Sequence, residues 1–154
     1  MPEPILRRPG DVAPIQNPVG GHIVFAVRGA ETGGKLTALE TVAAPREGPP
    51  FHTHAHEDEC LVVLEGTVRF RLREDVQDAR AGSFVYVPRG VPHTWENAGS
   101  TPARMLVLFT PSGMERFFDR FSALGDAGPE AFAEAAAGTG MEVVGPPLAV
   151  THPR

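Results

Sequence analysis

Residues 48–66 read GPPFHTHAHEDECLVVLEG, and the spacing of the histidines in this stretch decides the fold. Side chains alternate along an extended strand, so His52 and His54 project from one face, roughly 7 Å apart, and can both reach one metal ion. The polar residues that follow are expected to reverse the chain, after which the apolar run 59–65 returns beside the first strand as a hairpin. This hairpin predicts that Glu59 lies beside the two imidazoles.

A second stretch, residues 82–97, contains a further histidine and similar turn signals. It reads GSFVYVPRGVPHTWEN, in which the Pro-Arg-Gly at 88–90 predicts a tight turn between two strands. By alternation, His93, Trp95 and Asn97 share one face of the second strand. A lone histidine on such a face is more often structural than a ligand, but its conjunction with the first stretch favours a metal site. The candidate metal ligands are His52, His54, Glu59 and His93.

Together the two stretches resemble the two motifs of a single-domain cupin. Nine of the ten positions that the family marks are matched, by His52, His54, Glu59, Gly66, Gly82, Pro88, Gly90, His93 and Asn97. The departure is the opening glycine of the pattern, which would fall on Arg46, whereas the nearest glycine is Gly48. The resemblance implies an all-β fold, the cupin double-stranded β-helix or jelly-roll barrel, with one divalent transition metal. Three imidazoles and a carboxylate suit iron, nickel, cobalt, manganese and zinc alike.

Length and composition fit a small domain of this kind. The chain of 154 residues can enclose one core, and its 17 glycines and 16 prolines fit short strands joined by tight turns. We expect an irregular N-terminal arm over residues 1–20, the barrel over 21–110 and a helical tail packing on the barrel over 111–154. Further strands are expected over 22–28 and 35–44, which form a hairpin, and over 67–73 and 103–110.

The tail has helical periodicity. Ser112-Gly-Met-Glu115 is the pattern of a capping box, and apolar residues recur at helical spacing as far as Gly125. A second short helix is expected over 129–137 and an extended segment over 141–148. The apolar stripe of the first helix is expected to pack on the outside of the barrel or across a dimer interface, rather than to form a substrate lid. Such a tail resembles the quercetin-dioxygenase-like group of bacterial cupins.

Charge and cysteine content bear on partners and location. The formal net charge of -5 and the absence of a Lys/Arg cluster predict no nucleic-acid partner. No signal peptide or membrane span is visible, and the single cysteine, Cys60, fits a reducing compartment, so a cytoplasmic protein is expected. The dimerising habit of the resembling family favours a homodimer. Val62 and Leu64 support it, because they lie on the strand face opposite Glu59 and need a cover.

The resemblance also implies a reaction. Four protein ligands leave one or two open metal positions, where a small-molecule substrate and dioxygen can meet. In the resembling enzymes the ligating glutamate is also the base, so Glu59 is the expected catalytic residue of a dioxygenase for an enolisable phenol of flavonol or polyketide type. Two alternatives stay open, a non-redox cyclase, isomerase or epimerase with the same metal, and a binding or sensing cupin without catalysis.

Residues around the candidate ligands predict a substrate pocket, and His56 is a candidate for a supporting role beside the metal site. The aromatic candidates for the pocket are Phe51, Phe84, Tyr86 and Trp95. His56 is expected at the mouth of the site, contacting the ligands or relaying protons. Residues 57–58, beside it, are expected to form a solvated turn.

Overall fold

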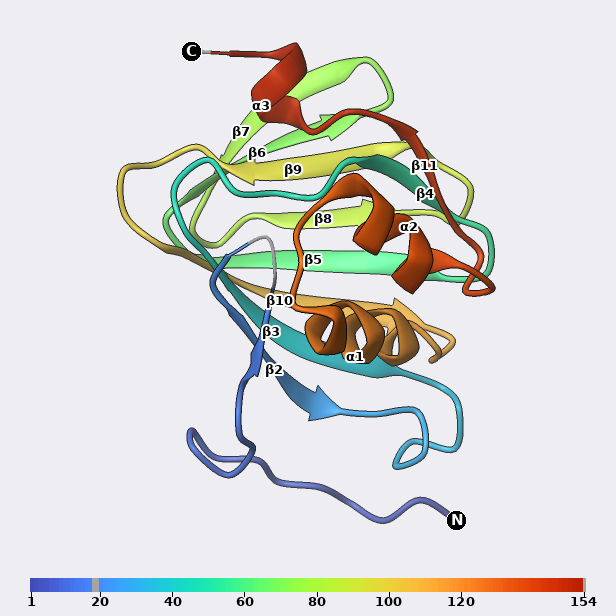
Figure 1. Cartoon of the computed structure of the whole chain (residues 1–154). Coiled ribbons are helices and arrows are strands. Elements are labelled where there is room, and N and C mark those ends of the chain that lie inside the picture. Colours follow the sequence, from blue (N-terminus) through green and yellow to red (C-terminus); the bar gives the residue numbers. More distant parts are fainter. Residues whose placement is uncertain (18–19, 154) are drawn as a thin grey trace.

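The computed structural model describes residues 1–17 and 20–153, and it consists of two antiparallel β-sheets that form a barrel (Figure 1). The first sheet has the order β1-β2-β3-β10-β5-β8. Its strands are β1 (Ile15–Gln16), β2 (His22–Val27), β3 (Thr37–Ala43), β10 (Ala103–Thr110), β5 (Asp58–Glu65) and β8 (Phe84–Val87). The second sheet has the order β11-β4-β9-β6-β7. Its strands are β11 (Met141–Gly145), β4 (Phe51–His54), β9 (His93–Asn97), β6 (Thr67–Leu72) and β7 (Asp75–Arg80).

Side chains that alternate inward from both sheets fill the core. Leu61 and Val63 of β5 and Val68 and Phe70 of β6 are at most 3% exposed, whereas Arg69, between the last two, is only half-buried. Each of these apolar side chains contributes about 1.5–3 kcal/mol by leaving water. The predicted all-β jelly roll is therefore confirmed, together with the inward face expected for 67–73.

The two hairpins predicted at the histidine motifs are wrong. β4 pairs with β9 and β11 in the second sheet, whereas β5 pairs with β10 and β8 in the first. β8 and β9 are likewise in different sheets. Each short turn is a corner that carries the chain from one sheet to the other. The sequence does not distinguish a corner from a hairpin here, because inward-facing side chains alternate in the same way in either sheet. Glu59 therefore reaches the imidazoles from across the barrel.

Most other predicted strands form near their expected bounds. β2 and β3 pair as the expected hairpin, and β10 has the predicted bounds. β1 lies in the segment expected to be an irregular arm and pairs with β2. The sequence does not predict β7, because DVQDAR has no apolar alternation; it pairs with β6 at the edge of the second sheet.

The tail adds helices and one strand to the barrel. Its helices are α1 (Glu115–Leu124), α2 (Pro129–Ala136) and α3 (Leu148–Thr151), and β11 pairs with β4. Gly125 ends α1 with a φ of 65°, as predicted. The predicted capping box does not form, since no side chain among the residues that the structure describes caps α1. Instead, the carboxylate of Glu115 accepts hydrogen bonds from the N–H groups of Gly113 (3.0 Å) and Gly29 (2.8 Å).

The apolar face of α1 points into the barrel. Phe117 and Phe121 of α1 are buried and stack with centroids 5.4 Å apart, and Phe132 of α2 packs on both. Figure 1 shows α1 and α2 together covering one side of the barrel. The expectation that this stripe packs on the outer wall or against a second copy is wrong, because it lines the same cavity as the histidines. Among the described residues no helix is long and apolar enough to cross a membrane.

Candidate metal centre

Four side chains meet inside the barrel, three from the second sheet and one from the first. His52 and His54 come from β4, His93 from β9 and Glu59 from β5. One ligand atom of each lies within 4.8 Å of the ligand atoms of the other three. All four residues are at most 5% exposed. The structure thus brings together the four ligands proposed from the sequence.

The converging atoms are the Nε2 atoms of the imidazoles and one carboxylate oxygen. Glu59 Oε2 lies 2.7 Å from His93 Nε2 and 3.2 Å from His54 Nε2. His52 Nε2 lies 3.2 Å from His54 Nε2. His52 and His93 are direct partners in the register of β4 and β9, which fixes their spacing.

Backbone carbonyl groups hold two of the imidazoles from behind. His52 Nδ1 lies 2.7 Å from the oxygen of Pro50, and His93 Nδ1 lies 2.9 Å from that of Val91. A carbonyl oxygen only accepts, so Nδ1 donates in both rings, and a neutral ring then directs the Nε2 lone pair toward the centre. Metal-ligating histidines are commonly held in this way. The set fits a divalent first-row transition metal.

Burial and mutual charge shift the pKa values of these groups. Burial, followed by the charges of His93 and His54, lowers the pKa of His52 well below its ordinary value. Burial opposes ionisation of Glu59, but the charge of His93 and the hydrogen bonds from His54 and His93 hold its pKa far below the ordinary value. Burial also opposes protonation of His93, yet the charge and hydrogen bond of Glu59 outweigh it and raise that pKa. The centre therefore contains an ionised carboxylate, as a cation site requires.

The loop before β4 meets two backbone requirements. Arg46, where the cupin pattern has glycine, has a φ of 68°, in the left-handed region that glycine adopts without strain. At Gly48, a Cβ atom would lie 1.8 Å from the carbonyl oxygen of Trp95. The departure at Arg46 thus leaves the loop conformation typical of a glycine in place.

Three of the four candidate ligands, His52, His54 and Glu59, form part of the wall of an apolar cavity of about 70 Å³. Its large apolar lining residues include Trp95, Phe109, Met114, Phe117, Phe118, Phe121, Phe132 and Met141. Of these residues, only Trp95 is predicted from the sequence to line the pocket. The helical spacing of the tail reveals a buried face, but the pattern alone does not say what that face covers.

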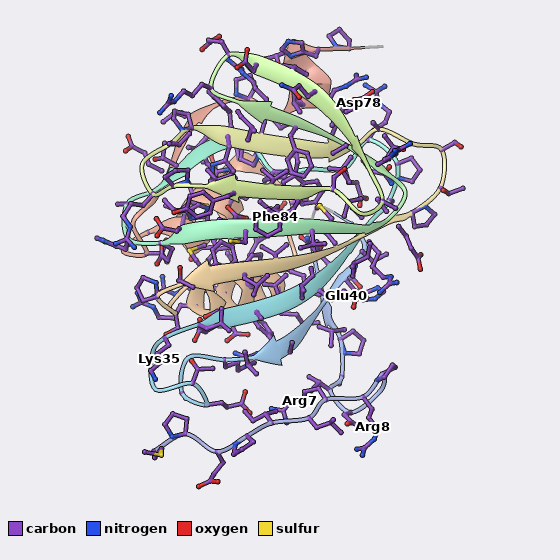
Figure 2. The ribbon with its side chains drawn as sticks, turned by 180° about the vertical axis from the view of Figure 1, so that it is seen from behind. Arg7, Arg8, Lys35, Glu40, Asp78 and Phe84 are labelled. Atoms are coloured by element: carbon purple, nitrogen blue, oxygen red, sulfur yellow. The ribbon has the colours of Figure 1, made fainter. Side chains whose placement is uncertain are left out.

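Three of the four aromatic residues predicted for the pocket lie elsewhere. Phe84 and Tyr86 are 64% and 54% exposed, and Figure 2 shows Phe84 on the sheet face turned away from the helices. Val87 of the same strand is buried instead, so the alternation of β8 has the opposite phase to the one predicted. Phe51 is buried beneath Arg71, whose guanidinium lies 4.0 Å from the ring centroid. Phe51 alternates with the ligand beside it and therefore faces away from the cavity.

The turn between β4 and β5 differs from its prediction. His56 is exposed, and its ring covers Gly140, where a Cβ atom would lie 2.4 Å from the imidazole Cδ2. His56 is not in the ligand cluster. Glu57 is only 4% exposed, so the prediction of a solvated turn is wrong for this residue. Asp58 is partly exposed and pairs with Arg89 at 3.1 Å.

Comparison with known protein families accounts for the barrel and its four ligands. Residues 39–109, from β3 to β10, match the family model described as a cupin domain. The protein has the cupin fold. The matched cupin region includes every ligand of the cluster, while the helices that close the cavity lie outside it.

Similar proteins match the chain over part of its length. Mannose-1-phosphate guanylyltransferase of Escherichia coli K12 is 27% identical over 96 residues, which cover 59% of this chain and 20% of that protein. Tetracenomycin polyketide synthase protein TcmJ of Streptomyces glaucescens is 31% identical over 80 residues, 52% of either protein. The chain thus spans about a fifth of the first relative and about half of the second. A solved structure of a predicted oxalate decarboxylase from Thermotoga maritima has a TM-score of 0.63 at 21% identity, covering 70% of this chain and 99% of that one.

Proposed function

We propose that this cupin is a metal-dependent dioxygenase acting on an enolisable aromatic small molecule. The observation that carries the proposal is the four-residue cluster at the wall of a cavity lined by aromatic side chains. A divalent transition metal held there would polarise a substrate oxygen and bring the substrate together with dioxygen. His52, His54 and His93 would hold the metal through Nε2, and Glu59 through a carboxylate oxygen.

Besides holding the metal, Glu59 would act as the base in this reaction. Its carboxylate is buried and lines the cavity, so it lies where it can accept the hydroxyl proton of an enolisable phenol next to the reacting centre. The resulting enolate is oxidised as dioxygen is reduced, and both oxygen atoms enter the product as a carbon–carbon bond breaks. The proton returns from Glu59 to the product. No external reductant is needed, because the enolate supplies the electrons that reduce dioxygen.

The cavity favours a flat aromatic substrate and requires motion to admit a large one. Trp95, Phe109 and Phe118 offer ring faces and edges to an aromatic ligand and exclude water. Its volume of about 70 Å³ is far below the roughly 300–1,000 Å³ of pockets for drug-sized ligands. A substrate with fused rings therefore enters only after α1 moves away from the barrel.

A non-redox cyclase or isomerase is the second candidate function. The likeness to TcmJ, a polyketide synthase protein that is 31% identical over 80 residues, supports a polyketide-like substrate for it. In such a reaction Glu59 would move a proton between two positions of a polyketide-like substrate, and dioxygen would not be consumed.

Oxygen uptake distinguishes these functions. Protein loaded anaerobically with iron, nickel, cobalt, manganese or zinc is mixed with a panel of flavonols and phenolic polyketides in an oxygen electrode. We expect one metal to support oxygen uptake equimolar with product, and Glu59→Gln to keep its metal while turnover falls at least about 100-fold. Glu65→Gln, an exposed carboxylate at the end of the same strand, is the matched control and should keep full turnover.

The other outcomes reject the dioxygenase. Product formed under nitrogen by the metal-loaded protein, with no oxygen uptake in air, would establish the cyclase or isomerase. Tight binding of a panel member without any product would establish a binding protein.

A further inference from the structure

One ligand of the candidate metal centre lacks the support that the other two imidazoles have. His52 and His93 each donate Nδ1–H to a backbone carbonyl oxygen. His54 Nδ1 is buried, and within the described part of the chain it has no hydrogen-bond partner. A ligating histidine almost always donates its outer N–H to a carboxylate, a carbonyl or a water molecule. The outer nitrogen of His54 is therefore in need of an acceptor.

A buried carboxylate, one of whose oxygens has no hydrogen-bond partner among the described residues, lies three positions along the chain from His54. Glu57 is 4% exposed, and its Oε2 is another buried atom without a hydrogen-bond partner among the described residues. Only two residues separate it from His54 along the chain, within the corner between β4 and β5. It shares the inward alternation of Glu59 and Leu61, which are also buried.

The surroundings of Glu57 agree with this placement. Its Oε1 lies beneath the loop that leads into α1, 3.5 Å from where a Cβ atom would stand at Gly113. A carboxylate buried without a full set of partners is costly, so its presence here calls for an explanation beyond packing.

We propose that Glu57 is a positioning residue whose carboxylate accepts the Nδ1–H of His54, directly or through one water molecule, when a metal binds His54 Nε2. This bond fixes the tautomer of His54 and increases the basicity of its ligating nitrogen. It completes the set in which every ligating imidazole is held from behind, two by carbonyl groups and the third by a carboxylate. The assignment rests on the metal site of the proposed function and goes beyond it.

Metal affinity tests the assignment without any substrate. Zn²⁺ and Co²⁺ dissociation constants are measured by competition with a chromophoric chelator for the wild type, Glu57→Leu and Glu57→Gln. We expect Glu57→Leu to bind both metals about 10–100-fold more weakly. Glu57→Gln keeps an acceptor oxygen and should lose less. The matched control is Glu96→Gln. Glu96 is also buried, neither of its carboxylate oxygens has a hydrogen-bond partner in the described part of the chain, and it belongs to β9 rather than to this corner. The metal affinity of this variant should stay within twofold of the wild type.

The tautomer of His54 gives a readout that a purely structural role would not move. In ¹⁵N-histidine NMR spectra of the zinc form, wild-type His54 should be protonated at Nδ1 and bound through Nε2, and Glu57→Leu should shift its Nδ1 resonance. Ligation of His54 through Nδ1, or equal zinc affinity in the wild type and Glu57→Leu together with an unshifted Nδ1 resonance in that variant, overturns the proposal. If Glu57→Leu does not fold, Glu57→Gln and the wild-type spectra decide.

His52→Ala separates this proposal from the one on which it rests. If His52→Ala binds zinc as tightly as the wild type, the metal site itself is rejected. If His52→Ala loses zinc while the Glu57 variants do not, only the role of Glu57 is rejected.

Discussion

Removing the carboxylate of Glu115 should detach the start of α1 from the barrel. This side chain begins the helix that closes the cavity, and it accepts hydrogen bonds from the N–H groups of Gly29 and Gly113 and from the hydroxyl of Thr37. Thr37 is fully buried in β3, and Gly29 is buried in the loop after β2. Glu115→Ala leaves both of these donors without their acceptor.

The size of the effect follows from these contacts. A hydrogen bond to a charged group contributes about 1.5–3 kcal/mol, and such contributions are not additive when one carboxylate accepts them all. Glu115 is only half-buried, so we do not add the two contributions at their maximum. We expect Glu115→Ala, which leaves the two buried donors without an acceptor, to lower the free energy of unfolding by about 3–4 kcal/mol. For a chain of this length that corresponds to a melting temperature lower by roughly 6–16 °C.

The effect should also depend on pH. Burial raises the pKa of Glu115, but the hydrogen bonds from Thr37 and from backbone N–H groups outweigh it, so the folded-state pKa lies below 4.5. A depressed pKa means that the carboxylate stabilises the fold fully above its unfolded-state pKa. That contribution is lost as the pH falls below about 4.5 and through the folded-state value.

Equilibrium unfolding in guanidinium chloride, followed by circular dichroism at pH 7 and pH 3, measures both quantities. Glu142→Ala, which removes an exposed carboxylate from β11, is the matched control and should change stability by less than about 0.5 kcal/mol. A difference below 1 kcal/mol between the wild type and Glu115→Ala at pH 7 would refute the reasoning. An equal difference at both pH values would refute the assigned charge.

Two further predictions concern the metal and the partner. His93→Ala should strip zinc from the protein, while His56→Ala should retain it, because His56 lies outside the ligand cluster; metal analysis after gel filtration checks this, and loss of zinc in both variants would make His56 a ligand. We also expect a homodimer in which a second copy covers the outer face of the first sheet, where Phe84 pairs with Val62 and is exposed together with Tyr86. Light scattering should show a dimer for the wild type and a monomer for the Phe84→Asp, Tyr86→Asp double variant; a monomeric wild type would contradict it.

The sequence predicts which four side chains meet in the cluster, but not the strands that pair to present them. Whether His52 and Glu59 face inward depends on local alternation, which is the same in either sheet of a barrel. Whether β4 and β5 pair with each other depends on hydrogen bonds to strands distant in sequence, such as the pairing of β5 with β10. The ligand set could therefore be identified even though both predicted hairpins are wrong.

The pocket was harder to predict for a similar reason. In β8 the aromatic and valine side chains alternate, and either set could face the core on composition alone; the structure buries Val87 and exposes Phe84 and Tyr86. In the tail, the helical stripe indicates that Phe117 and Phe121 are covered, but only the packing of α1 shows that they line the cavity. An acidic turn residue is usually solvated, so the pattern around Glu57 does not predict its burial.

The tail strand β11 ties the metal centre to a part of the chain that carries no ligand. β4 bears two of the four ligands, and it pairs with β9 at His52 and His93, whereas β11 runs beside it from Met141 to Gly145. The backbone of β4, which orients two of the ligands, is thus paired with a strand that lies far later in the sequence. Occupancy of the centre and docking of the tail must then favour one another, so that slowed amide exchange in β11 would report an ion bound at the centre.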